Sequence, residues 1–204
     1  MPRLARNVLD EYRYFHVATR GVGECFIYAD DLDRLGFADC FWNATLEYEL
    51  KCLVACQVGT HYHALFDTEG GDLSAAMRKL NGTYARRFNC RHERRGHLFG
   101  DRFHTWIVED ESHLSSTIEY ILWNPVRAGL CEFPDEWEWS WLSPEYANAV
   151  DPILSRSTGS DCPMGQSLRR VCERRRRAQL RAARGARQRK SPKGVGQYVD
   201  RDEL

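Results

Sequence analysis

The segment CLVACQVGTHYHALF, residues 52–66, decides the fold of this chain. It is mostly apolar on both sides of Gly59, which predicts two buried strands joined there as a hairpin. Successive side chains of a strand point to opposite faces of its sheet. His61 and His63 therefore stand on one face, with Cα positions about 7 Å apart, while Tyr62 points to the other face.

Two imidazoles at this spacing form a chelating pair. Imidazole binds several divalent ions, and a third oxygen donor from elsewhere would leave positions open for a phosphate or a water molecule. Two alternatives remain at this point. In the first, the two histidines line a half-buried strand and bind no metal. In the second, they form a zinc site together with Cys52 and Cys56, which a regular strand places on one face.

Outside the hairpin, clusters of aromatic and β-branched residues predict strands, and apolar residues three or four apart predict helices. The predicted strands are residues 12–20, 50–58, 61–67 and 103–108, and the predicted helices are residues 30–48, 72–89 and 111–123. The last helix is expected to stop at Pro125 and to be completed by Gly129. Three helices against a small, mostly antiparallel sheet form an α+β sandwich.

The length of 204 residues suits one domain with an appendage, and we place the domain at residues 1–150. Residues 151–204 are predicted to be a linker and a basic tail, helical or disordered. Between Arg169 and Lys190 the tail has eleven Lys or Arg and one acid, Glu173. Such a run is a solvated helix or arm, or a contact with nucleic acid.

No stretch approaches the roughly 18 apolar residues that a membrane span needs, and the first residues contain no apolar signal segment. Eight cysteines are too sparse in a chain of this length for a disulfide scaffold. We therefore expect a soluble, cytoplasmic protein without a membrane partner.

Tyr120 and Asn124 are four residues apart in the third predicted helix and share a face. If that helix packs beside His61 and His63, Asn124 can offer an amide oxygen as third metal ligand while Tyr120 points at the phosphate. A tyrosine phenol is a poor nucleophile at its ordinary pKa near 10, but a divalent cation on the phosphate makes it competent. The alternatives are that Tyr120 is a packing aromatic and that Asn124 is a helix stop before Pro125.

Three blocks of sequence carry a resemblance to a known family. In order, they are THYHALF at 60–66, RRGHLFGDRFH at 94–104 and YILWNPVRAGL at 120–130. Together they resemble the single-tyrosine HUH transposases, most of all the branch associated with repetitive extragenic palindromes (REP). The resemblance extends from about Tyr14 to Trp141 and implies a ferredoxin-like α+β domain that cuts and rejoins single-stranded DNA.

The resemblance also implies roles for individual residues. His61 and His63 would hold Mg²⁺ or Mn²⁺, with Asn124 as a further ligand, and Tyr120 would be the catalytic nucleophile. Its attack on a phosphodiester would leave a 5′-phosphotyrosyl link and a free 3′-hydroxyl, and a second 3′-hydroxyl would reverse the step without a nucleotide cofactor. The family often has Pro-Asn before the HUH element, whereas this chain has Gly59-Thr60, which alters the expected turn.

The expected partner is single-stranded or hairpin DNA, bound by a monomer or a homodimer. The candidate DNA contacts are Arg86, Arg87, Arg102, His104 and Arg127, because arginine bridges phosphates well, although each can equally be part of a solvated surface. Phe99 or Trp106 can stack on an unpaired base. Four other histidines are expected to have no metal role: His16, His92, His97 and His113. The alternative function is a domesticated hairpin-binding module that has lost catalysis.

Overall fold

A computed structural model describes residues 11–146, in which strands and helices follow the predicted order. The strands are β1 (Tyr14–Arg20), β2 (Lys51–Gln57), β3 (His61–Asp67), β4 (His104–Val108) and β5 (Ser140–Leu142). The helices are α2 (Asp31–Glu47), α3 (Leu73–Arg91), α4 (Glu111–Leu122) and α5 (Asn124–Arg127), with 3-10 turns η1 (Val22–Glu24) and η2 (Pro134–Glu136). The predicted domain boundary near residue 150 and the basic tail lie outside the described residues and stay predictions.

The three long helices begin in the same way. Asp30, Asp72 and Asp110 precede α2, α3 and α4, and each carboxylate accepts a hydrogen bond from the backbone N–H three residues later. Such a cap satisfies one of the N–H groups that have no partner within the helix. The helix starts therefore follow from local sequence. Within residues 11–146, none of the helices has the length and apolar character needed to cross a membrane.

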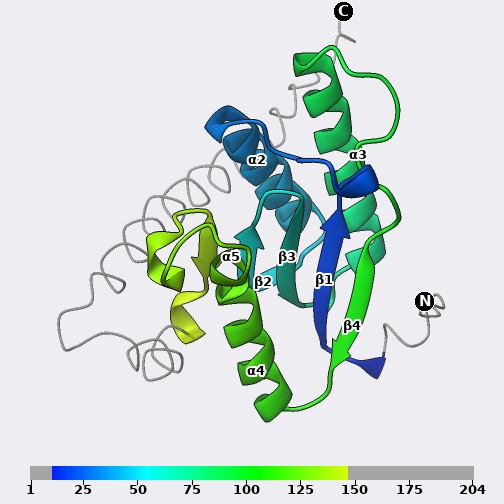
Figure 1. Ribbon diagram of the computed structural model, residues 1–204. Helices are drawn as coiled ribbons and strands as arrows, with labels where there is room; N and C mark the ends of the chain where they lie inside the picture. The colour runs from blue at the N-terminus through cyan, green and yellow to red at the C-terminus, as the bar shows by residue number, and fades with distance from the viewer. Residues whose placement is uncertain (1–10, 147–204) are drawn as a thin grey trace, which may run out of the picture. The chain divides into compact units, whose positions relative to one another are not determined.

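The sheet has the strand order β4-β1-β3-β2-β5, and every neighbouring pair is antiparallel (Figure 1). The first four strands place β1 and β3 at the centre, as in a ferredoxin-like sandwich, so the predicted fold class is confirmed. Strand β5 was not predicted, because it is only three residues long and lies in a tryptophan-rich segment. It extends the sheet by pairing with β2.

The two faces of the sheet have separate cores. Helices α2 and α3 pack on one face, where Phe15, Tyr62 and Phe66 are buried. Helix α4 packs on the other face, against residues such as Leu65 and Leu142. The strand alternation places His61 and His63 on the α4 side, because the neighbouring Tyr62 belongs to the core on the opposite side.

A β-bulge in β2 overturns one expectation about the cysteines. Cys52 pairs with Phe66 but Val54 pairs with Leu65, so β2 has one extra residue there. The extra residue reverses the alternation, and Cys52 packs into the α2 and α3 core whereas Cys56 packs into the α4 core. The prediction that both thiols share a face is therefore wrong.

The expected stop at Pro125 is also corrected in part. Helix α4 ends at Leu122, as predicted, but the chain continues into the short helix α5, with Pro125 in its first turn. Proline is accepted there because a first-turn N–H has no helical partner to lose. The chain then turns at Gly129, which has φ 68°. Asn124 is the first residue of α5, so the prediction that it lies on the same helix as Tyr120 is wrong, because the chain breaks at Trp123 between the two helices.

Candidate active site

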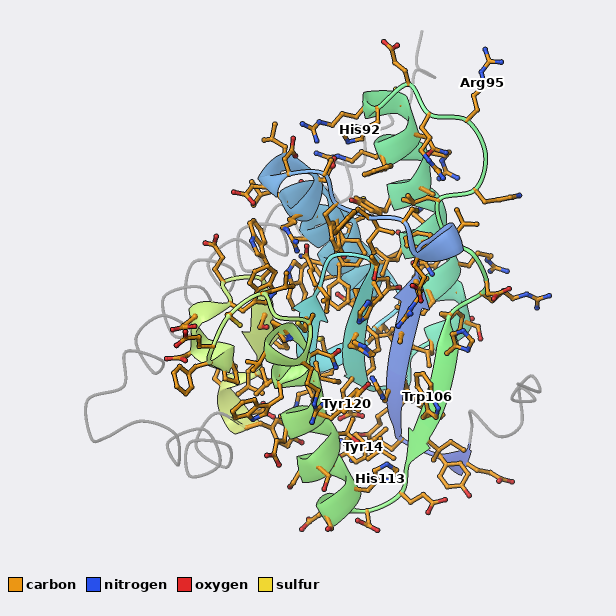
Figure 2. The ribbon with its side chains drawn as sticks, in the orientation of Figure 1. Tyr14, His92, Arg95, Trp106, His113 and Tyr120 are labelled. Atoms are coloured by element: carbon orange, nitrogen blue, oxygen red, sulfur yellow. The ribbon has the colours of Figure 1, made fainter. Side chains whose placement is uncertain are left out.

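A cavity of about 720 Å³ lies on the α4 side of the sheet. Residues from β1, β3, β4, α4 and α5 line it, and they include His61, His63, Trp106, Tyr120 and Asn124. Figure 2 labels two residues of this lining, Tyr120 on α4 and Trp106 on β4. The cavity thus collects side chains that lie far apart in the sequence.

His61 and His63 are close to one another at the start of β3. Their ring centroids are 5.1 Å apart and the ring planes are perpendicular, at 90°. Tyr62 points away from them, and its hydroxyl donates to Oδ1 of Asn81 at 2.8 Å. The strand alternation read from the sequence therefore holds at these three positions.

Each of the two imidazoles is held through its Nδ1 atom. Nδ1 of His61 lies 3.0 Å from Oγ1 of Thr60, and Nδ1 of His63 lies 2.9 Å from Nε2 of His16. When Nδ1–H donates in both pairs, the lone pair of each Nε2 is free. Metal-binding histidines are commonly oriented in this way by a hydrogen bond to the other ring nitrogen.

The imidazoles of His16, His61 and His63 are neutral near pH 7. Burial lowers the pKa of His63 to about 2 and that of His16 to about 4. Burial also lowers the pKa of His61, against a hydrogen bond with Asn124 that raises it. A neutral imidazole keeps the lone pair that a metal ligand needs.

Tyr120 faces the histidines from α4. Its ring centroid lies 5.6 Å from that of His63 and 5.8 Å from that of His16, in edge-on contacts. The side chain is 43% exposed, so the phenol remains accessible to a substrate. The guanidinium carbon of Arg127 lies 4.9 Å from the centre of the Tyr120 ring.

Asn124 is buried between Tyr120 and His61. Its Nδ2 donates to the backbone carbonyl of Tyr120 at 3.2 Å. This hydrogen bond occupies the amide nitrogen and leaves the amide oxygen of Asn124 available in the cavity that it lines together with His61.

Comparison with known proteins identifies the family. The model of the IS200-like transposases matches residues 16–124, which span both histidines, Tyr120 and Asn124. The chain belongs to the IS200-like transposase family. The predicted resemblance to single-tyrosine transposases is thereby confirmed, and with it a transposase-like function. No curated protein matches the sequence.

A solved structure shows the same fold as this IS200-like transposase, and a second one has a lower similarity. A REP-associated tyrosine transposase bound to a REP hairpin has a TM-score of 0.55 at 14% identity, with 76% of this chain and 88% of that chain covered. A protein from Deinococcus radiodurans R1, described as a transposase, has a TM-score of 0.41 at 16% identity, with 61% of this chain and 98% of that chain covered.

The donors in the cavity of this IS200-like transposase fit a divalent cation. Residues 11–146 contain no group of three His, Cys, Asp or Glu side chains placed to hold a metal. The predicted set of His61, His63 and Asn124 is of another kind, with two imidazoles and one amide oxygen. Nitrogen and oxygen donors of this kind suit Mn²⁺. The zinc alternative loses its geometric basis, since Cys52 and Cys56 lie on opposite faces of the sheet.

The predicted DNA contacts of this IS200-like transposase divide into two groups. Three of them line the cavity: Arg102, His104 and Arg127. Arg86 and Arg87 belong to α3, on the other face of the sheet, and Arg87 pairs with Asp39 of α2 at 3.6 Å. The structure does not bring Arg86 and Arg87 to the cavity, and their contact with DNA stays a prediction.

Sequence reasoning missed the position of His16 in this IS200-like transposase. His16 was predicted to have no metal role, and its ring lies buried against His63 and contacts Trp106, with the His16 and Trp106 centroids 4.9 Å apart. The available signal was its place in β1 between the core residues Phe15 and Val17, which puts it on the same side of the sheet as His63. Which strand lies beside β1 could not be read from that pattern.

Proposed function

We propose that this protein is a metal-dependent, single-stranded DNA endonuclease and strand transferase that acts through a covalent link between Tyr120 and DNA. The observation that carries the proposal is the convergence in one cavity of a nucleophile and a donor set. Tyr120 lies against the ring of His63, His61 lies beside His63, and Asn124 lines the same cavity. Nucleophile and donors at such close range suit phosphoryl transfer.

Tyr120 would supply the covalent chemistry. Its Oη forms a bond to the scissile phosphorus while the bond from phosphorus to the 3′ oxygen breaks. The phenol proton passes to solvent, and the departing 3′ oxygen takes up a proton to become a 3′-hydroxyl. The product is a 5′-phosphotyrosyl link, which another 3′-hydroxyl reverses to join strands. Arg127, which lies over the Tyr120 ring and donates to the backbone oxygen of Tyr120, would hold that ring in place.

His61, His63 and Asn124 would hold Mg²⁺ or Mn²⁺ in this cavity. The ion, when bound, polarises the scissile phosphate and offsets its charge. The role of Thr60 and His16 is to fix the ring orientation, because each contacts the Nδ1 atom of one histidine. Asn124 is held by its hydrogen bond to the backbone of Tyr120, which ties the third donor to the nucleophile.

The substrate we propose is a DNA hairpin with an unpaired flank. The neighbouring structure that shares the fold is a tyrosine transposase bound to a REP hairpin. In this chain Arg102 and Arg127 line the cavity and are able to bridge backbone phosphates. A flexible single strand can enter a site in which a rigid duplex would not place its phosphate against Tyr120.

The test is covalent capture of labelled DNA. Hairpins with single-stranded flanks, incubated with the protein and Mn²⁺, are expected to give an adduct that survives denaturing electrophoresis. Tyr120→Phe should abolish it, while Tyr12→Phe, which alters another exposed tyrosine outside the cavity lining, should not. An adduct that persists in Tyr120→Phe would refute the assignment. Equal hairpin binding by both proteins with no adduct in either would instead favour the non-catalytic binding module.

A further inference from the structure

Three aromatic rings form a row across the α4 side of the sheet. His63 of β3 lies 5.1 Å from His16 of β1, with the planes 31° apart, and His16 lies 4.9 Å from Trp106 of β4, with the planes 29° apart. Backbone pairing holds His16 directly opposite Trp106. The row therefore begins at a proposed metal ligand and ends at Trp106.

Trp106 is the exposed end of this row. Among the described residues β4 is an edge strand that pairs only with β1, so no further strand lies beyond Trp106. The side chain lines the cavity and is 37% exposed. His104, two residues earlier on the same face, stacks near it at 6.0 Å with the planes 28° apart. Both rings are thus presented to the cavity.

The exposure of Trp106 distinguishes it from the other aromatic candidate. Phe99 packs against the core on the opposite face and contacts Tyr84 at 6.4 Å, which makes it a structural residue. Trp106 keeps part of its apolar surface exposed at the cavity, beside the stacked rings of His16 and His104. Proteins that bind single-stranded nucleic acids commonly combine basic side chains with exposed aromatic rings, and the bases stack on these rings. The cavity has both features.

We propose that Trp106, extended by His104, binds the unpaired base of the nucleotide next to the phosphate that Tyr120 attacks. The proposal rests on the proposed function and adds a base-binding subsite to it. Only His16 separates the two residues, since it contacts Tyr120 at 5.8 Å and Trp106 at 4.9 Å. A base stacked on Trp106 therefore places its own phosphate toward the nucleophile.

Stacking on an aromatic ring is tolerant of base identity, because every base has a π face. The subsite thus selects an unpaired base over a paired one, whose face is already covered by its neighbours in the duplex. It would hold the flank in register with Tyr120 and leave sequence readout to other contacts. Arg102, on the loop before β4, lines the same cavity and can bind the adjoining phosphate.

The test uses DNA hairpins in which each unpaired position is replaced in turn by an abasic site. Binding is measured by fluorescence anisotropy in Tyr120→Phe protein, so that no strand is cut. One abasic position is expected to weaken binding about tenfold or more. Trp106→Leu should bind intact DNA about as weakly as the protein with Trp106 binds the abasic DNA. The same abasic site should cause no further loss of binding in Trp106→Leu, which is the result that a double-mutant cycle gives for a direct contact.

The controls separate this subsite from general DNA affinity. Trp106→Phe should restore most of the binding, and Phe26→Leu should leave it unchanged, because Phe26 is 68% exposed but lies outside the cavity lining. If Trp106→Leu does not fold, Trp106→Thr takes its place in the same cycle, because threonine also lacks an aromatic ring and suits a strand. A flank with no abasic-sensitive position, or a full abasic penalty in Trp106→Leu, overturns the subsite. Covalent capture by the protein with Tyr120 intact remains a separate result, so adduct formation without base dependence would refute the subsite alone.

Discussion

Replacement of His16 by phenylalanine probes how the proposed metal site is oriented. Phe keeps a ring between Trp106 and Tyr120, which lie 4.9 Å and 5.8 Å from the His16 ring. It removes the nitrogen that lies 2.9 Å from Nδ1 of His63. The perturbation therefore deletes one hydrogen bond and preserves most of the packing.

Two consequences of His16→Phe can be given a magnitude. Nδ1 of His63 is buried and loses its partner, which costs about 1–3 kcal/mol of folding free energy. The His63 ring is also no longer fixed, and loss of such a partner typically lowers metal affinity about 10- to 100-fold. That range corresponds to roughly 1.4–2.8 kcal/mol. Metal binding should thus weaken even at temperatures at which the variant stays folded.

The assay is titration of the DNA-free protein with Mn²⁺, followed by the loss of the free-ion electron paramagnetic resonance signal. Thermal unfolding of the metal-free protein provides an independent readout of the lost hydrogen bond. His97→Phe is the matched control, because His97 is exposed and lies outside the cavity lining. Unchanged Mn²⁺ affinity in folded His16→Phe would refute the reasoning that His16 orients His63.

Two further predictions concern residues away from the cavity. Asp67 is 6% exposed and accepts bonds of 2.9 and 2.8 Å from Arg13. Burial opposes its ionisation, but the bonds from Arg13 outweigh this and lower its pKa. Asp67→Asn should therefore reduce the free energy of unfolding at pH 7 by about 1–2 kcal/mol. Denaturant titration should show this difference from the unsubstituted protein becoming smaller as the pH falls below about 4, because Asp67 is then protonated. A difference that becomes larger at low pH would contradict a lowered pKa. Tyr62→Phe leaves Oδ1 of Asn81 without its donor and should lower the free energy of unfolding by about 1–2 kcal/mol. Mn²⁺ affinity should stay unchanged, because Tyr62 faces the core on the opposite side of the sheet. Weaker Mn²⁺ binding would show that the two faces are coupled.

Much of the fold was predictable because its signals are local. The aspartate caps, the apolar periodicity of the helices and the alternation of β3 act within a few residues of one another. The third helix was predicted to carry Tyr120, and it does. The short strand β5 was missed, because three residues contain too little pattern to distinguish a strand from a loop.

Two errors have different physical causes. The β-bulge that separates Cys52 from Cys56 exists only in the pairing of β2 with β3, and no short window of sequence contains such information. The prediction that Asn124 lies on the same helix as Tyr120 failed because the turn that separates α4 from α5 was not visible in the helical spacing.

The sequence by itself determined that His61 and His63 share a face, that Tyr120 lies near the end of a helix with Asn124 four residues later, and that the chain resembles the transposase family to which it belongs. These properties follow from backbone periodicity and from the motifs. Only the tertiary structure decided that His16 lies against His63 and that Trp106 ends the row of rings at the cavity. The reason is that strand neighbours are chosen by the burial of both faces of the sheet at once, and residues 16, 63 and 106 meet only when that sheet has formed.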